Sequence, residues 1–264
     1  MYSVFRPINH YDQVLDVLSM THINSVKTSS IPLADFWHPE RNLKQKERVI
    51  KKLGISDNNV YTQYCFEYPT GAYKNRKNGQ KLKYSQSSMT DLMIITSNTQ
   101  RITIEAKYTE YVKDKEYNPK LADWYDNATH RKDIIQCWLD YIYQSGKCEI
   151  NDAECLIHRC AKLPYQFLHR TASACLDCEN PMLVYQLFYD NESYSDMKEF
   201  EKLLKSAAQM LTLKSDKLPF YIIEVKVAKN PKSAENIFEI MKTQTQYIFS
   251  DEINILDGYT LLDI

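Results

Sequence analysis

The chain has 264 residues, of which 44% are hydrophobic and 25% charged, and its formal net charge is -1. This is ordinary globular composition, with ample length for a core. No apolar run approaches the ~20 residues that cross a bilayer, and the N-terminus lacks the pattern of a secretory signal, so we expect a cytoplasmic protein without a membrane partner. The seven cysteines are odd in number, which favours reduced thiols. Only five glycines occur and none forms a phosphate-binding loop, which argues against a nucleotide-cradling fold.

The first half of the chain predicts one helix followed by three strands. Residues 1–38 are interpreted as an N-terminal extension, and residues 39–264 as a single α/β domain. A helix is predicted over residues 39–53, ending at Gly54. Strands are predicted over residues 60–69, 90–96 and 101–111. The polar connection between the first two strands is expected to form a hairpin with Asn78-Gly79 at its tip.

After Asp123 the pattern changes to a helical period. Helices are predicted over residues 130–146, 152–163, 164–178, 194–213 and 232–250. Strands are predicted over residues 181–190 and 219–228, with a last strand or hairpin near the C-terminus. The resulting order from residue 39, α-β-β-β-α-α-α-β-α-β-α-β, predicts a mixed β-sheet flanked by helices.

Charged side chains stand at the meeting ends of two predicted strands. Asp91 begins one strand, Glu105 and Lys107 end the next, and the turn "SNTQ" joins the two strands. Antiparallel pairing would bring Asp91 beside residues 105–107, and alternation along a strand sends Glu105 and Lys107 to the same face. Two adjacent carboxylates repel each other unless a cation lies between them. Mg²⁺ would accept both carboxylates, the backbone carbonyl of Ala106, and water.

This stretch resembles the PD-(D/E)xK nuclease superfamily, in which an acid, an apolar strand and a turn are followed by a second strand that ends in Glu-x-Lys. The restriction endonuclease-like core of that superfamily has the order α-β-β-β-α-β. The proline that precedes the first acid in that superfamily is replaced here by Thr90. The resemblance implies that Asp91 and Glu105 hold Mg²⁺. It also implies that Lys107 orients or helps to deprotonate the attacking water, or stabilises charge on the phosphate.

The same resemblance suggests further site residues. Many such enzymes carry another acid on the first helix, for which Glu47 is the candidate, with Glu67 on the next strand as its competitor. Gln136 lies on the helix after the motif, where several branches place a Gln or Lys, although the expected Gln-x-x-x-Tyr spacing fails here. The segment His169-Arg170-Thr-Ala-Ser is similar to one in a bacterial family of restriction endonuclease-like proteins, and Arg170 could grip a phosphate through its planar fork.

Three other features of the sequence bear on function. A basic stretch before the motif strands is expected to contact the nucleic-acid backbone, or else to be a solvated loop; it contains Lys74, Arg76, Lys77, Lys81 and Lys83. A second Glu-x-Lys, Glu224 and Lys226, lacks a hairpin partner and is interpreted as the rim of a later strand. Cys175 and Cys178, with Cys155, His158 and Cys160 nearby, suggest either zinc or buried thiols.

These patterns predict a Mg²⁺-dependent DNA endonuclease with a restriction endonuclease-like fold, in a restriction or phage-defence setting by resemblance. Because many enzymes of this kind cut as dimers, a homodimer is one expectation. Two alternatives stay open. One is a nuclease that acts on RNA or on branched or damaged DNA. The other is a non-catalytic nucleic-acid-binding or interaction domain of the same fold, stabilised by zinc.

Overall fold

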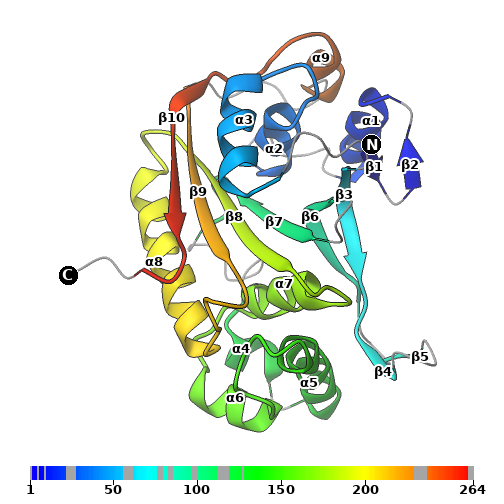
Figure 1. Ribbon diagram of the computed structural model, residues 1–264, viewed down its shortest axis with the longest axis vertical. Helices are drawn as coiled ribbons and strands as arrows, with labels where there is room; N and C mark the ends of the chain where they lie inside the picture. Colours follow the sequence, from blue (N-terminus) through cyan, green and yellow to red (C-terminus); the bar gives the residue numbers. More distant parts are fainter. Residues whose placement is uncertain are drawn as a thin grey trace.

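The computed structural model describes residues 2–260 except residues 5, 9, 22–27, 56–61, 76–79, 83–85, 97–99, 112–118, 127 and 229–236. Its centre is an open, mixed β-sheet of six longer strands in the order β10-β9-β8-β7-β6-β3, continued at one edge by the short strands β1 and β2 (Figure 1). The longer strands are β3 (Gln63–Thr70), β6 (Ser88–Ile95), β7 (Arg101–Lys107), β8 (Pro181–Tyr189), β9 (Phe220–Val227) and β10 (Phe249–Asp257).

The sheet combines antiparallel and parallel pairs of strands. β3, β6 and β7 form an antiparallel meander, whereas β7, β8 and β9 are parallel and are joined by crossovers that contain helices. β10 returns antiparallel to β9. At the far edge β1 (Tyr2–Val4) pairs parallel to β3, and β2 (Arg6–Ile8) pairs with β1.

Helices cover both faces of the sheet (Figure 1). One face carries α1 (Asp12–Thr21), α2 (Ser30–Phe36), α3 (Leu43–Lys52) and α9 (Ile237–Thr243). The other face carries α4 (Leu121–Tyr125), α5 (Thr129–Gln144), α6 (Ala153–Arg159), α7 (Tyr165–Cys175) and α8 (Tyr194–Met210). The α/β class and the mixed, helix-flanked sheet predicted from the sequence are therefore confirmed.

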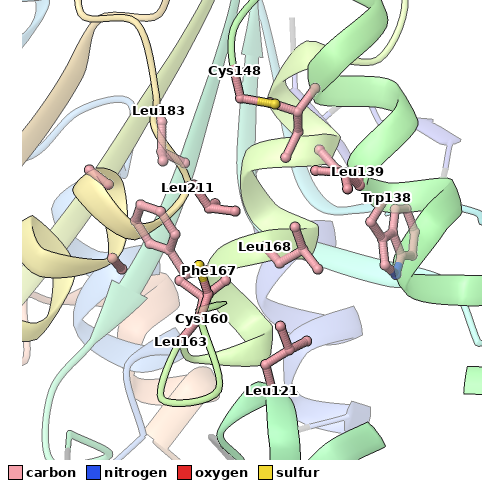
Figure 2. Close-up of a cluster of buried hydrophobic side chains, with 14 of the residues drawn as sticks. Leu121, Trp138, Leu139, Cys148, Cys160, Leu163, Phe167, Leu168, Leu183 and Leu211 are labelled. Atoms are coloured by element: carbon pink, nitrogen blue, oxygen red, sulfur yellow. The ribbon is translucent and has the colours of Figure 1, made fainter. Parts of the chain in front are cut away.

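Two hydrophobic cores result, one on each face of the sheet. On the face of α5, α7 and α8, Phe167 is fully buried and stacks on Tyr185 of β8, with ring centroids 5.8 Å apart. Figure 2 shows Leu183 of this same strand together with Phe167 and Leu168 of α7 and Trp138 and Leu139 of α5. This packing fixes α7 against β7 and β8, and α7 carries several residues of the site described below.

The predicted elements lie close to those observed, and three of the differences bear on the fold. The first helix begins at Leu43, after Asn42 in a left-handed conformation, and it ends before Gly54, whose φ is +68°. The last predicted helix is wrong at its end, because Phe249 and Ser250 belong to β10, where Phe249 pairs with Val227. Finally, α1 and α2 lie within the proposed N-terminal extension of residues 1–38, and their apolar residues share a core with α3 and the sheet.

The basic connection before β6 forms a small antiparallel ladder, as predicted. β4 (Tyr73–Asn75) pairs with β5 (Gln80–Lys81), and both extend beyond the main sheet from the end of β3 (Figure 1). Lys74 and Lys81 lie in these strands. Arg76, Lys77 and Lys83, with the expected tip at Asn78-Gly79, lie outside the described residues.

Candidate functional site

The hairpin of β6 and β7 brings Asp91 and Glu105 together. The ladder runs from Ile95↔Arg101 to Leu92↔Ile104, so the next position along it sets Asp91 opposite Glu105. Beyond Leu92 the Asp91 side chain, and not a backbone carbonyl, is the acceptor: its Oδ2 accepts the backbone N–H of Ala106 at 2.7 Å. Since Leu92 and Ile104 both contribute to the core on the α1–α3 face, Asp91 and Glu105 lie on the α7 face. The predicted convergence of the two carboxylates is therefore observed.

Glu105 is buried, with 1% of its surface exposed, and three donors surround it. Its Oε1 accepts from Lys107 Nζ at 3.1 Å and from Gln166 Nε2 at 2.6 Å. Its Oε2 accepts from Arg170 Nε. Gln166 and Arg170 are four residues apart on α7, which places both on the helix face that lies over β7. Glu105 is thus held between its own strand and the neighbouring helix.

The charges in this cluster act strongly on one another. Burial raises the pKa of Asp91 well above its usual 3.8, and the carboxylate of Glu105 raises it further, against the opposing effect of Arg170. Burial lowers the pKa of Lys107, but Glu105 and Asp91 outweigh that effect and raise it above 10.5. Lys107 is therefore a protonated cation at neutral pH, whereas ionisation of Asp91 costs free energy in the folded protein.

Glu67 on β3 is a third carboxylate near the pair. Its neighbours Phe66 and Tyr68 pair with Leu92 and Thr90, which sets residue 67 beside Asp91. The charge of Glu67 contributes to the raised pKa of Asp91. Its φ of +49° lies in the left-handed region that a non-glycine residue rarely adopts, and such strain is often found at functional sites. Of the two candidates for an additional acid, Glu67 is the one near Asp91.

Glu47 and Gln136 lie elsewhere. Glu47 is an exposed residue of α3, on the opposite face of the sheet from Glu105, so its assignment to the site is wrong. Gln136 of α5 holds the start of α6: its Oε1 accepts from Ala153 N at 2.8 Å, and its Nε2 donates to Asn151 O at 2.9 Å. Gln136 thus supports the start of α6, and it is not among the described residues that bond to Glu105.

A pocket of about 500 Å³ opens beside the carboxylates, between the start of β6 and helices α4, α5 and α7. Gln166 and Arg170 belong to both the pocket and the Glu105 cluster. Ser88 and His169 also line the pocket, and Ser88 Oγ lies 2.8 Å from His169 Nδ1 while accepting from Arg170 Nη1. Sequence reasoning missed Ser88 and Gln166. The sequence signal that could have identified Gln166 was its spacing of four residues from Arg170, which puts both on one helix face.

Comparison with known protein families gives one match. Residues 7–229 match the family described as a domain of unknown function, DUF6946. This chain belongs to that family. Neither the curated proteins nor the solved structures contain a match to it. None of the helices in the described part of this DUF6946 chain is long and apolar enough to pass through a bilayer.

The second Glu-x-Lys of this DUF6946 chain belongs to a different structure. Glu224 of β9 is buried and accepts from Lys198 of α8 and from Asn254 Nδ2 of β10 at 3.1 Å. Lys226 points away into solvent. Glu224 is therefore part of an ion-paired network between the sheet and α8, and its interpretation as a rim residue is wrong.

The cysteines do not form a zinc site within the described residues. No group of three or more His, Cys, Asp or Glu side chains there is arranged to hold a metal ion, and all seven cysteines are free thiols. Burial raises the pKa of the Cys175 thiol to about 12. Cys160 Sγ instead donates to Met210 O at 3.0 Å.

Proposed function

We propose that this protein is a metal-dependent endonuclease that hydrolyses phosphodiester bonds in DNA through a restriction endonuclease-like core. One observation carries the proposal: Asp91 and Glu105 share one face at the end of a hairpin, with Lys107 in contact with Glu105. The order α3, β3, β6, β7, helices, β8 supports it, since this is the order that the resemblance implies. The burial of the cluster supports it as well, because buried, perturbed carboxylates gather at catalytic sites.

The donor set can be tested against Mg²⁺ by counting acceptor positions. A carboxylate offers about four lone-pair directions. Glu105 uses three of them for Lys107, Gln166 and Arg170, so one remains, whereas Asp91 uses one for Ala106 N–H. Mg²⁺ in proteins commonly takes one or two carboxylates and completes its coordination with water and substrate oxygens. The residues therefore fit Mg²⁺, with Asp91 as the main ligand and Glu105 as the second.

The backbone of Ala106 supports the same assignment. Its N–H points toward Asp91, and the N–H and C=O of one residue in a strand point to the same side. The carbonyl of Ala106 therefore belongs to the same edge as the Asp91 carboxylate. When bound, a divalent cation would supply Lewis-acid stabilisation of the phosphate and activation of the attacking water.

The remaining chemistry falls to the side chains of the chain itself. Lys107 is protonated at neutral pH because the two carboxylates raise its pKa. It is therefore suited to stabilise negative charge on the phosphate, and it is a poor acceptor for the proton of the attacking water. Gln166 and Arg170 fix the rotamer of Glu105, so that its free lone pair keeps one direction.

The test is cleavage of plasmid DNA with Mg²⁺ or Mn²⁺ and with EDTA. Asp91→Asn and Lys107→Met should each lose more than about 100-fold in rate, because each removes a charge from the reacting centre. The matched control is Lys226→Ala, which changes the lysine of the other Glu-x-Lys at an exposed position and should keep the full rate. Equal rates in Asp91→Asn and in the unaltered protein would refute the proposal.

One observation favours the non-catalytic alternative, a nucleic-acid-binding domain of the same fold. Glu105 is already neutralised by two cations, Lys107 and Arg170, which leaves it little capacity for a metal ion. In that case Mg²⁺ would change neither cleavage nor stability, while DNA would still bind. Calorimetric titration of Mg²⁺ and Mn²⁺ into the protein and into Asp91→Asn separates the two functions, because only the nuclease requires binding that Asp91→Asn abolishes.

A further inference from the structure

The pocket beside Glu105 has two chemically different sides. One side is aromatic: Trp124 stacks on Tyr165 with ring centroids 3.7 Å apart and planes inclined by 10°. Trp138 completes this wall and donates from Nε1 to the Tyr165 hydroxyl at 3.0 Å. The Arg131 guanidinium lies over the Trp124 ring, 5.4 Å from its centroid. Because Tyr165 and Arg131 both lie over the Trp124 ring, a flat ring would stack against this wall on the outer side of the Arg131 plane.

The other side carries hydrogen-bond donors. Arg170 donates to Ser88 Oγ, so the hydroxyl proton of Ser88 is free to go to His169 Nδ1 at 2.8 Å. Burial and the nearby Arg170 hold the pKa of His169 well below 6.5, so its ring is neutral and Nδ1 can accept. The ring proton then lies on Nε2, which makes His169 a donor at its far nitrogen.

Charge and size narrow the class of ligand. Arg131 and Arg170 line the pocket, and none of the described residues that line it is acidic. A volume of about 500 Å³ suits a single nucleotide and is too small for a duplex. Gln166, which also lines the pocket, has a buried side-chain oxygen without a donor among the described residues, and a buried polar atom is normally hydrogen-bonded.

The pocket adjoins the candidate catalytic carboxylate. Gln166 lines it and donates to Glu105 at 2.6 Å, while Arg170 contacts both Ser88 at the pocket and Glu105. A nucleotide held here would therefore have a flanking phosphate beside Asp91 and Glu105. We propose that this pocket binds one unpaired nucleotide of a DNA strand, with the base on the aromatic wall and the phosphate on Arg170 and His169. The proposal rests on the proposed nuclease function and assigns it a substrate: single-stranded DNA, or duplex DNA with an unpaired nucleotide.

The first test is binding in EDTA, which does not depend on cleavage. Fluorescence anisotropy compares a labelled single-stranded 20-mer with the same strand annealed to its complement. The unaltered protein should bind the single strand at least about tenfold more tightly, which is the effect expected from stacking one base. Arg131→Ala should abolish this preference. Lys132→Ala is the matched control: it removes the same charge at the next position of α5, where Lys132 pairs with Glu154, and it should keep the preference.

A second variant and a small-molecule probe distinguish the loss of the pocket from misfolding of the protein. Trp124→Ala should weaken the binding of the single strand about tenfold and leave the affinity for the duplex unchanged. The fluorescence of Trp124 and Trp138 should be quenched by thymidine monophosphate and not by inorganic phosphate at the same concentration. Equal quenching by inorganic phosphate would reduce the pocket to a general anion site, and equal affinity for the two DNA forms would overturn the proposal.

The two proposals fail in different ways. Selective binding of the single strand without metal-dependent cleavage would refute the nuclease and leave the pocket assignment standing as that of a binding domain. Metal-dependent cleavage that is lost in Asp91→Asn, but is equally fast on duplex and single strand and unaffected by Arg131→Ala, would refute the pocket assignment alone.

Discussion

Replacing Asp91 by Asn should make the folded protein more stable at neutral pH. Burial and the adjacent Glu105 raise the pKa of Asp91 well above 3.8, so its negative charge is unfavourable in the folded state. Asparagine has the same shape, and its side-chain oxygen can still accept the N–H of Ala106 that Asp91 accepts at 2.7 Å. The substitution therefore removes an unfavourable charge without removing the hydrogen bond.

The sign of the pH dependence follows from linkage. Because the folded-state pKa of Asp91 is raised, the folded protein binds its proton more tightly than the unfolded chain does. This contribution to stability is fully present at pH values below the unfolded pKa, near 3.8, and is lost as the pH rises through the raised pKa. Asp91→Asn lacks the titrating group, so its free energy of unfolding relative to that of the unaltered protein should increase as the pH rises. We expect about 1 kcal/mol at pH 8, within the range of ~0.5–2 kcal/mol for relief of a strained functional site. In a chain of this size that gain raises Tm by about 2–4 °C.

Thermal and urea unfolding at pH 5 and pH 8, with and without Mg²⁺, measure both effects. Mg²⁺ at ten times its Kd should add about 1.4 kcal/mol to the unaltered protein and nothing to Asp91→Asn. Asp190→Ala is the control with the opposite sign. Asp190 accepts from Ser193 N at 2.9 Å just before α8, and alanine has no acceptor, so this change should cost about 1 kcal/mol. A less stable Asp91→Asn at pH 8, or equal stabilisation of both proteins by Mg²⁺, would refute this account of Asp91.

Three further substitutions test the packing around the site by urea unfolding. Arg170→Met should cost about 3 kcal/mol, since it takes one cation from the buried Glu105, and a loss below about 1 kcal/mol would mean that Glu105 does not depend on it. Gly258→Ala should cost about 1–3 kcal/mol, because the added Cβ would lie 2.2 Å from the buried ring of Phe220; an unchanged midpoint would show that the ring can move. Phe167→Ala should cost about 3–5 kcal/mol from the core of α7 and β8, and a smaller loss would mean that the neighbours close the cavity.

The half of the site that comes from the hairpin could be predicted from the sequence, because it is local. Alternation along a strand and a short turn are enough to place Asp91 beside Glu105. The other half comes from α7, whose residues in contact with Glu105 lie more than 60 positions away from it along the chain. No local pattern specifies which face of a distant helix will lie over a given strand. The resemblance had named Arg170 as a phosphate-binding residue, but its contact with Glu105 and the part played by Gln166 required the structure.

The error at Glu47 has a related cause. The sequence shows that α3 is amphipathic, with Val49 in the core and Glu47 exposed, but it does not show which face of the sheet the helix covers. α3 packs on the face opposite to Glu105. In the same way, the sequence pattern over residues 232–250 continues into β10, where pairing of Phe249 with Val227 overrides the helical period.

The two Glu-x-Lys triplets show why the three letters alone do not identify a site. Glu224 and Glu105 are both buried and both accept from lysine. Glu224 shares its charge with Lys198, which is partly exposed, and no second carboxylate stands opposite it on a paired strand, since its partner on β10 is Asn254. Glu105 faces Asp91 across the hairpin, and burial together with this opposing carboxylate raises the pKa of Asp91. A cation relieves such repulsion, and Lys198 already contacts both Glu224 and the neighbouring carboxylate Glu201 of α8, so the first triplet offers the stronger reason to bind a metal.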